Sequence, residues 1–524
     1  MKGNCWRDET LVLRDGVKLK SRIWEPPGIG PWPTLLMRQP YGRAIASTVT
    51  YNHPSWWASH GYLVVIQDVR GQGDSDGTFT GFKQEASDTT QTHKWVRSLP
   101  ACNGLLGTYG FSYQGFTQLI AEQNTPPPQC MAPAMTGLNE YDHWSCDGGA
   151  FWWHIGLSWG LQLAALKAKR NNDVEGWAEI RESLEDESYL REGPSILEKF
   201  DPEGMAMDWL TRSNESNRNW ITHKPLKIWL KQPMLLIGGW WDPHLRGIID
   251  LYKKSVEAGG KPEIHIGPAS HLEWWGETQQ LLLQFFNRHL QSSKYPVEEH
   301  HKPILWNQTN RRWQSSTNST NPIKYWGLTS KGSACLDSND GQLNPDCKGD
   351  GFLQIVHDPW RPVPAIGGHL APKPGIAERK AIDSRPDVAI FTSPQLTEDI
   401  QIEGIPSLNL NVEADQDGFD LCVALSIINQ NQTKVLQIST GILRIRGPLA
   451  RQRIRREVHL QAILADLKKG ERLRISIAGS SWPAIGINPG NNKHPCGATN
   501  VHCNVVTMSL NLSDSNFHVL PLLA

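Results

Sequence analysis

The chain has 524 residues and nearly balanced charge, with 52 Lys and Arg against 53 Asp and Glu, a net charge of −1 at pH 7. At about 150 residues per domain this length predicts two to four domains. The neutral balance argues against a nucleic-acid partner, because such binding depends on neutralising phosphates. No apolar run approaches the roughly 20 residues that span a bilayer, so we expect no membrane partner. The 23 Trp residues are unusual and predict aromatic-walled surfaces.

The cysteines and the N-terminus bear on the cellular compartment. Nine cysteines without a C-x-x-C pair lack zinc-ligand spacing, so we expect mostly reduced, buried thiols, no metal and no cofactor. The first ten residues, MKGNCWRDET, contain no apolar segment of the kind that a secretory signal requires. These features predict a cytoplasmic protein. They leave the oligomeric state open, a homo-oligomer included.

Strand and helix signals alternate over residues 1–138. Segments 11–13 and 17–23 flank Asp15-Gly16, a dipeptide typical of a hairpin turn. Further strands are expected at short apolar runs bounded by turn residues, at 34–37, 62–66 and 107–110. Helices are expected at 54–59, 85–98 and 113–123. This alternation predicts a parallel sheet wrapped by helices.

The alternating pattern is interrupted and then resumes. Residues 139–227 are rich in Trp and have helical spacing at 159–168 and 174–184. Over residues 228–300, strands are expected at 234–237 and 263–266 and helices at 245–258 and 277–290. We therefore predict one α/β domain formed by residues 1–138 and 228–300, with a helical cap inserted at 139–227.

Residues 301–524 have a different character. Short strand-like runs separated by Gly, Pro, Asn and Asp occur at 351–356, 387–391, 408–412, 421–428, 434–438 and 472–477. Residues 459–468 are expected to hold one or two helical turns. Many short strands at near-regular spacing predict a C-terminal β-sandwich.

The segment G-F-S-Y-Q-G at residues 110–115 places Ser112 between an expected strand and an expected helix. A nucleophilic serine needs such a bend, and the following helix N-terminus supplies N–H donors. The usual signature is G-x-S-x-G, whereas Gln114 stands at the second glycine position here and Gly115 follows it. On this motif alone, a serine in an ordinary turn is an alternative interpretation.

Two further residues complete the order Ser, Asp, His that nucleophilic hydrolases of this type use. Asp242 follows an expected strand through G-G-W-W, and His271 follows the next through G-P-A-S. Asp242 would hold the tautomer of His271, and His271 would take the Ser112 proton. His244 and His265 are competing bases, of which His265 lies inside an expected strand and His244 is expected to line the pocket.

An oxyanion hole needs two donors. The backbone N–H of Tyr113 is one by its position after the nucleophile. The loop R-Q-P-Y-G-R at 38–43 contains no H-G-G-G string, so the phenol of Tyr41 is the second candidate. From the residues alone, Tyr41 as a wall residue of the pocket is the alternative.

With these residues in place, the chain resembles the CocE/NonD acyl hydrolases, a family that includes cocaine esterase, α-amino-acid ester hydrolases and X-Pro dipeptidyl-peptidases. The family's nucleophile motif, G-x-S-Y-x-G, accounts for the displaced glycine. The matching strings, in chain order, are M-R-Q-P-Y-G-R at 37–43, V-I-Q-D-V-R-G-Q-G-D-S-D-G at 65–77, G-F-S-Y-Q-G-F-T-Q at 110–118, D-G-G-A-F at 147–151, G-G-W-W-D at 238–242, G-P-A-S-H at 267–271 and D-P-W-R-P-V-P-A-I-G-G at 358–368.

The resemblance implies both fold and site. The fold would be an α/β-hydrolase domain with an inserted helical cap and a C-terminal jelly-roll β-sandwich. Ser112, Asp242 and His271 would form the catalytic triad, and Tyr41 with the amide of Tyr113 the oxyanion hole.

One departure from the family bears on the substrate. In α-amino-acid ester hydrolases, acidic residues soon after the triad Asp bind the substrate ammonium, whereas here residues 243–246 are P-H-L-R. An obligatory α-amino substrate is therefore not expected. Aromatic walls favour an aryl or bulky apolar acyl group. By their positions in or beside the matched strings, the expected pocket residues are Trp144, Phe151, Trp152, Trp240, Trp241 and His244.

The sequence thus predicts a serine hydrolase that cleaves small-molecule carboxylic esters through an acyl-enzyme. One alternative is an X-Pro dipeptidyl-peptidase, or an amide or α-amino-acid ester hydrolase. Another is a catalytically silent, Trp-rich binding protein on a hydrolase scaffold, against which the intact Ser112, Asp242 and His271 argue.

Overall fold

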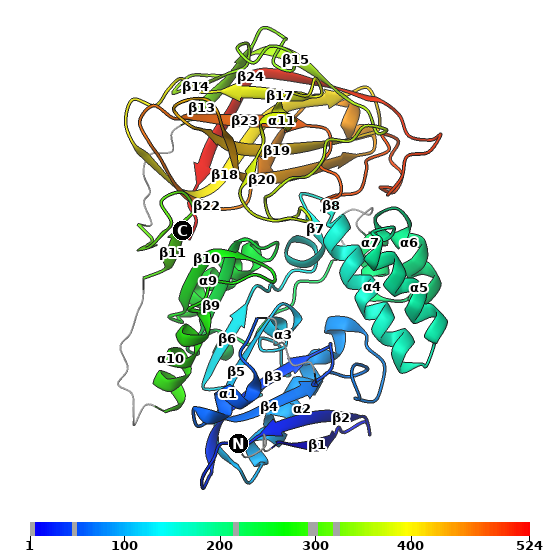
Figure 1. Cartoon of the computed structure of the whole chain (residues 1–524), viewed down its shortest axis with the longest axis vertical. Coiled ribbons are helices and arrows are strands. Elements are labelled where there is room, and N and C mark those ends of the chain that lie inside the picture. Colours follow the sequence, from blue (N-terminus) through cyan, green and yellow to red (C-terminus); the bar gives the residue numbers. More distant parts are fainter. Residues whose placement is uncertain (1–5, 45–49, 213–219, 292–301, 318–324, 524) are drawn as a thin grey trace.

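Two β-sheets and a group of helices make up the molecule (Figure 1). The computed structural model describes residues 6–44, 50–212, 220–291, 302–317 and 325–523. In Figure 1 the first sheet (blue to green) lies at the lower end, the second (yellow to red) at the upper end, and a group of green-cyan helices to one side between them.

The first sheet is parallel in its centre. Its ten strands follow the spatial order β1 (Trp6–Val12), β2 (Lys18–Trp24), β4 (Leu63–Asp68), β3 (Trp32–Gln39), β5 (Cys102–Phe111), β6 (Cys130–Ala134), β9 (Leu235–Trp241), β10 (Glu263–Ser270), β11 (Ile304–Asn307) and β12 (Arg312–Ser315). The hairpin predicted around Asp15-Gly16 is confirmed, because β1 and β2 pair antiparallel on either side of it. From β4 to β11 neighbouring strands are parallel, so their carboxyl ends lie along one edge.

Helices cover both faces of this sheet. The helices α1 (Pro54–Ser59) and α10 (Thr278–Leu290) pack on one face, and α2 (Glu85–Ser98) packs on the other. Successive residues of a strand point to opposite faces: Leu35 of β3 packs with Trp57 and Phe286, whereas Leu36 packs with Val96. The helices α8 (Lys227–Leu230) and α9 (Leu245–Ala258) also border this sheet. The continuous apolar character of the strands follows from this two-sided burial.

A group of four helices lies between β6 and β9 in the chain. They are α4 (Trp153–Arg170), α5 (Val174–Glu185), α6 (Tyr189–Phe200) and α7 (Met205–Arg212). A Cβ atom at Gly160 of α4 would lie 2.4 Å from the Cβ of Ala206 on α7, so a small residue is needed where these two helices meet. A short hairpin of β7 (Cys146–Asp147) and β8 (Ala150–Phe151) precedes α4. We call α4–α7 the cap.

The second sheet surrounds a separate hydrophobic core. Its inward side chains, among them Phe391, Leu410, Leu425, Ile475 and Met508, belong to one buried cluster. The twelve strands are β13 (Trp326–Ser330), β14 (Gln342–Pro345), β15 (Asp350–His357), β16 (Ala377–Glu378), β17 (Val388–Thr392), β18 (Ile400–Ala414), β19 (Gly418–Ile428), β20 (Val435–Arg446), β21 (Ile454–His459), β22 (Ile463–Leu467), β23 (Arg472–Ala478) and β24 (Val506–Leu520), with the short helix α11 (Lys380–Asp383).

The helix after the nucleophile segment is shorter than expected. Instead of 113–123, α3 spans Tyr113–Phe116. The Thr117 hydroxyl donates to the carbonyl of Gln114 at 3.0 Å, and the Gln118 amide donates to the carbonyl of Gly110 at 3.1 Å. Polar side chains that bond to nearby carbonyls compete with a continuing helix, which explains the early end.

Two other expectations are also wrong. Residues 459–468 form no helical turn, because β22 pairs with β18 as a strand. The strands β11 and β12, which the prediction places in the sandwich, instead extend the first sheet, because β11 pairs in parallel with β10. The predicted boundary between residues 300 and 301 lies outside the described residues.

Two expectations from composition concern membranes and thiols. Of the helices in the described ranges, none has the length and apolar character to cross a membrane. The eight described cysteines are free thiols, of which Cys130, Cys146, Cys422 and Cys503 are buried and Cys347 is exposed. Cys5 lies outside the described residues.

Candidate active site

Ser112 occupies a sharp bend between β5 and α3. Its φ is 57°, a value that non-glycine residues rarely adopt and that costs on the order of 1–3 kcal/mol. The Ser112 N–H donates to the carbonyls of Ala134 (3.0 Å) and Met135 (3.1 Å), at the end of β6. These bonds hold the backbone in its strained conformation, as is typical of a nucleophile elbow.

The glycine pattern of this segment follows from close packing. A Cβ atom at Gly110 would lie 2.4 Å from the Cβ of Gln114, and one at Gly115 would lie 2.9 Å from the carbonyl oxygen of Ala134. The Gln114 side chain thus occupies the space beside Gly110. Glycine is required at residue 115, one position later than in G-x-S-x-G, because that residue faces β6.

Asp242 and His271 form a hydrogen-bonded pair at the carboxyl ends of β9 and β10. His271 Nδ1 lies 2.6 Å from Asp242 Oδ1, the carboxylate is fully buried and the His271 side chain is 28% exposed. Burial raises the pKa of Asp242, but His271 and His244 outweigh it and hold this pKa well below its ordinary value. The His271 ring packs 5.2 Å from that of Phe111, the residue before Ser112. The structure therefore brings Ser112, Asp242 and His271 to one edge of the sheet.

A second imidazole shares the Asp242 carboxylate. His244 Nδ1 lies 3.4 Å from Asp242 Oδ1, and the His244 backbone N–H donates to Asp242 Oδ2 at 3.1 Å. The rings of His244 and His271 stack at 4.8 Å and 25°. Burial lowers the pKa of His244, so this imidazole is neutral near pH 7. His265, the other competing base, lies within β10.

One carboxylate and two imidazoles form a donor set that divalent cations use. Their ligand atoms in Asp242, His244 and His271 lie within 4.8 Å of one another. The 2.6 Å contact between Asp242 and His271 is, however, the hydrogen bond that a general base needs. The arrangement is thus accounted for without an ion.

Tyr41 directs its phenol toward Ser112. Burial raises the pKa of Tyr41 to about 12, against the lowering effect of the neighbouring Trp159 and Ser112 side chains. The phenol also accepts a hydrogen bond from the indole N–H of Trp159, at 3.1 Å. Tyr41 therefore presents a neutral O–H beside the candidate nucleophile.

Tyr113 can contribute its backbone and not its side chain. As the first residue of α3, its N–H has no acceptor within that helix. Its phenol points away and donates to Glu85 Oε1 at 2.8 Å, while Glu85 Oε2 accepts from Arg38 at 2.7 Å. This buried pair anchors the tyrosine side chain away from the role of oxyanion donor, which leaves the backbone N–H as the candidate donor.

The expected pocket residues divide into two groups. Trp144 and Trp152 both contact the His244 ring, at 4.7 and 5.4 Å between ring centroids. The structure therefore brings these three together beside His271.

Among the described residues, Phe151, Trp240 and Trp241 make no such contact with His244. Phe151 is fully buried and packs against Gly156 of α4. Trp240 directs its indole N–H to the carbonyl of Trp306 on β11, at 2.6 Å. Within the described part of the chain, no ring contact or hydrogen bond joins these three side chains to the Ser112, Asp242 or His271 side chains. Nothing therefore places them in the pocket wall.

Two residues at the site are not predicted from the sequence. Trp159 of the cap reaches Tyr41, and the sequence pattern that contains it predicts only a helix at 159–168. Gln461, between β21 and β22, donates its side-chain amide to the carbonyl of Asp242 at 2.8 Å. No sequence pattern marks Gln461.

Replacement of Gln461 by Leu should loosen the loop that carries Asp242. Loss of one buried hydrogen bond is expected to lower the free energy of unfolding by about 1 kcal/mol and to lower kcat several-fold. Urea unfolding and ester kinetics measure both. Gln416→Leu is the matched control, because Gln416 bonds to Asn504 in the same domain; it should change stability alone. Equal kcat values for wild type and Gln461→Leu would contradict the prediction.

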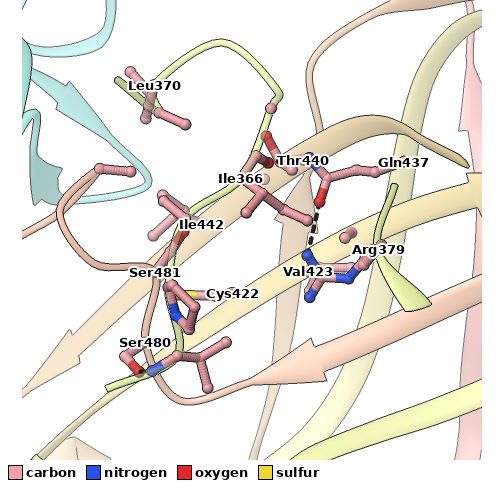
Figure 2. Close-up of a pocket in the computed structure, with 18 residues that line it drawn as sticks. Ile366, Leu370, Arg379, Cys422, Val423, Gln437, Thr440, Ile442, Ser480 and Ser481 are labelled. Atoms are coloured by element: carbon pink, nitrogen blue, oxygen red, sulfur yellow. Dashed lines mark hydrogen bonds between the residues drawn. The ribbon is translucent and has the colours of Figure 1, made fainter. Parts of the chain in front are cut away.

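A separate small pocket lies in the C-terminal domain (Figure 2). Residues of β19 and β20 line it, together with several residues from the loops around 363–371 and 480–484. Arg379 donates to Gln437 Oε1 at 2.7 Å, as Figure 2 shows, and to Asp383 Oδ1 at 3.0 Å. None of the predicted site residues lines this pocket, so it is no part of the candidate site.

Comparisons with known proteins place this chain in a family. The pattern of the X-Pro dipeptidyl-peptidase (S15 family) matches residues 15–273, and that of the X-Pro dipeptidyl-peptidase C-terminal non-catalytic domain matches residues 290–516. The chain is 25% identical over 487 residues to the cocaine esterase of Rhodococcus sp. (strain MB1 Bresler), covering 83% of this chain and 82% of that protein.

Solved structures are similar over almost the whole chain. An α-amino-acid ester hydrolase has a TM-score of 0.71 at 20% identity, with 99% of this chain and 97% of the other covered. A CocE/NonD family hydrolase from Staphylococcus aureus has a TM-score of 0.70 at 18% identity, with 98% and 93% covered. These likenesses agree with the α/β-hydrolase domain, cap and C-terminal β-domain predicted from the sequence. The chain belongs to the CocE/NonD, S15-type family of serine hydrolases.

Proposed function

We propose that the protein hydrolyses carboxylic esters through an acyl-enzyme on Ser112, with His271 as general base and acid and Asp242 as its partner. The observation that carries the proposal is the 2.6 Å contact between His271 Nδ1 and Asp242 Oδ1 at the sheet edge where Ser112 occupies a strained bend. A carboxylate bonded to Nδ1 leaves Nε2 free to accept a proton. This arrangement supports nucleophilic catalysis by a serine.

The reaction then takes two stages. Ser112 Oγ attacks the ester carbonyl carbon while His271 takes the hydroxyl proton, and the resulting oxyanion accepts hydrogen bonds from the Tyr41 O–H and the Tyr113 N–H. The bond to the leaving alcohol breaks, and His271 protonates that alcohol. Water next attacks the acyl carbon, His271 takes the water proton, and the acid leaves as Ser112 regains its proton.

The charges around the site favour an ester without a free amine. Trp144 and Trp152 supply apolar walls, which suit an aryl or bulky apolar acyl group. The buried Asp242 is engaged by two imidazoles. Glu140, a buried carboxylate of the same region, bonds to Trp209 and His223. Neither carboxylate is therefore open to a substrate ammonium, which an exopeptidase would need.

The full-length protein can be tested on paired substrates. We expect turnover of p-nitrophenyl butyrate and little release of p-nitroaniline from Ala-Pro-p-nitroanilide. A fluorophosphonate probe should label Ser112, as located by peptide mass spectrometry. Preference for the anilide would favour the dipeptidyl-peptidase alternative. A folded protein that neither turns over the esters nor takes the label would favour the binding-protein alternative.

The variant Tyr41→Phe should lower kcat by about 10²–10³, the usual cost of one oxyanion donor. The free energy of unfolding should change little, because the ring and its packing remain. Steady-state kinetics and urea unfolding measure the two quantities. An unchanged kcat would remove Tyr41 from the oxyanion hole.

The role of Tyr41 also predicts a pH dependence. A phenol whose pKa is raised to about 12 keeps its proton as the pH rises past its ordinary value near 10. The ratio of kcat in wild type to kcat in Tyr41→Phe should therefore stay constant between about pH 8 and pH 10.5. A ratio that falls with a midpoint near pH 10 would contradict the assignment.

A further inference from the structure

We propose that Trp159, on cap helix α4, positions the Tyr41 phenol as an oxyanion donor, so that the cap controls the geometry of the oxyanion hole. The inference rests on the proposed function, in which Tyr41 is one of two oxyanion donors. Trp159 acts through Tyr41 and is therefore a positioning residue.

The hydrogen bond between the two side chains has one direction. Trp159 Nε1 lies 3.1 Å from Tyr41 Oη, and an indole N–H can only donate, so the phenol oxygen accepts. The phenol proton is then directed away from Trp159, and the Ser112 side chain is a polar neighbour of this phenol. A phenol that accepts a hydrogen bond is also a stronger donor. Trp159 thus sets both the direction and the strength of the Tyr41 O–H.

Stacked rings connect Trp159 to the side chain of Tyr113, the residue whose backbone N–H is the second oxyanion donor. Trp159 stacks on Trp209 of α7 (5.7 Å, 29°), Trp209 on Phe82 (5.9 Å, 21°) and Phe82 on Tyr113 (5.2 Å, 14°). We call Trp159, Trp209 and Phe82 the aromatic arch. Its ends contact Tyr41 and Tyr113, the two residues that carry the oxyanion donors. Since packed aromatic rings resist displacement, the arch holds the Tyr41 phenol and the Tyr113 ring relative to each other.

The arch also depends on the cap. Trp159 and Trp209 lie on α4 and α7, which belong to the cap, whereas Phe82 lies on the hydrolase domain. The indole N–H of Trp209 donates to the buried carboxylate of Glu140 at 3.2 Å, which orients that ring. A displacement of α4 would take the Trp159 indole away from Tyr41. The position of the cap and the activity of the oxyanion hole are thereby coupled.

The test removes the indole N–H and keeps an aromatic ring. Trp159→Phe, Tyr41→Phe and the double variant are assayed in the full chain with p-nitrophenyl butyrate. We expect Trp159→Phe to lower kcat about 2- to 10-fold, the equivalent of one neutral hydrogen bond, with KM nearly unchanged. In the Tyr41→Phe background the same change should have no further effect on kcat, because the phenol through which Trp159 acts is absent.

A transition-state analogue gives a readout that a purely structural role would not change. A boronic acid forms a tetrahedral adduct with the serine, and one adduct oxygen lies in the oxyanion hole. Trp159→Phe should weaken boronate binding by the same factor by which it lowers kcat. Trp153→Phe is the matched control, since Trp153 lies on the same helix and its indole N–H donates to Leu190 within the cap. That variant should leave boronate affinity unchanged.

Two results would overturn the proposal. In the first, Trp159→Phe leaves kcat and boronate affinity unchanged. In the second, it lowers kcat equally in the wild-type and Tyr41→Phe backgrounds, which would make Trp159 a wall residue only. Failure of the proposed function itself is distinguishable, because Tyr41→Phe alone would then leave kcat unchanged.

Discussion

Ser112→Ala should abolish the turnover of p-nitrophenyl esters in a protein that still folds. The loss of the nucleophile in comparable sites lowers kcat by a factor on the order of 10⁶. The fold should persist, because alanine has the same Cβ at φ 57° and the bonds from residue 112 to Ala134 and Met135 come from the backbone N–H. Ester kinetics and thermal unfolding measure the two outcomes.

A second serine supplies the control for this experiment. Ser158 lies on α4, one residue from Trp159, and its hydroxyl donates to the carbonyl of Ile155 in the same helix. Ser158→Ala should keep both activity and fluorophosphonate labelling, whereas Ser112→Ala should lose both. Substantial turnover by purified Ser112→Ala would assign the chemistry to another residue and end the acyl-enzyme proposal.

The parts of the site that the sequence predicts are those determined by local patterns, namely the order of strands and the residues that follow them. Asp242 and His271 each follow a buried parallel strand, and parallel strands end at one edge of a sheet, so their order after Ser112 predicts that the three meet. The helices at 54–59, 85–98 and 245–258 have the bounds of α1, α2 and α9. In each case apolar spacing and nearby turn residues determine the element.

The parts of the site that the sequence does not predict depend on contacts between segments that are far apart in the chain. Trp159 and Tyr41 are 118 residues apart, and Gln461 and Asp242 are 219 apart. Only the folded chain brings such pairs together, because nothing in the local pattern of either residue specifies the other. The same reason applies to β11, whose apolar residues fit a sandwich strand as well as a further strand beside β10.

The second imidazole on Asp242 changes how this carboxylate works. His271 Nδ1 and His244 Nδ1 both face Asp242 Oδ1, while the His244 backbone N–H donates a hydrogen bond to Asp242 Oδ2. These three groups can all donate a hydrogen bond to the carboxylate. Against the effect of burial, the charge interactions and hydrogen bonds of His271 and His244 keep the pKa of Asp242 low.

Asp242→Asn should lower kcat by about 10⁴ with little change in KM. The amide has one accepting oxygen and one donating NH₂ group. With the oxygen toward the His244 backbone N–H, the NH₂ group faces His271 Nδ1 and selects the tautomer with its proton on Nε2. That tautomer cannot take the Ser112 proton, so the general base is lost while substrate binding remains.

The wrong tautomer leaves a signature apart from kinetics. In wild type, the His271 Nδ1 proton bonded to Asp242 should give a downfield proton NMR resonance, and Asp242→Asn should abolish it at unchanged thermal stability near pH 7. Asp250→Asn on α9 is the control, because Asp250 pairs with Lys254 within the same helix, and it should keep both the resonance and the activity. A less than tenfold loss of kcat in folded Asp242→Asn would mean that His271 does not need this carboxylate. The second imidazole, His244, would then be the base to test next, since it shares the same oxygen and stacks on the same ring.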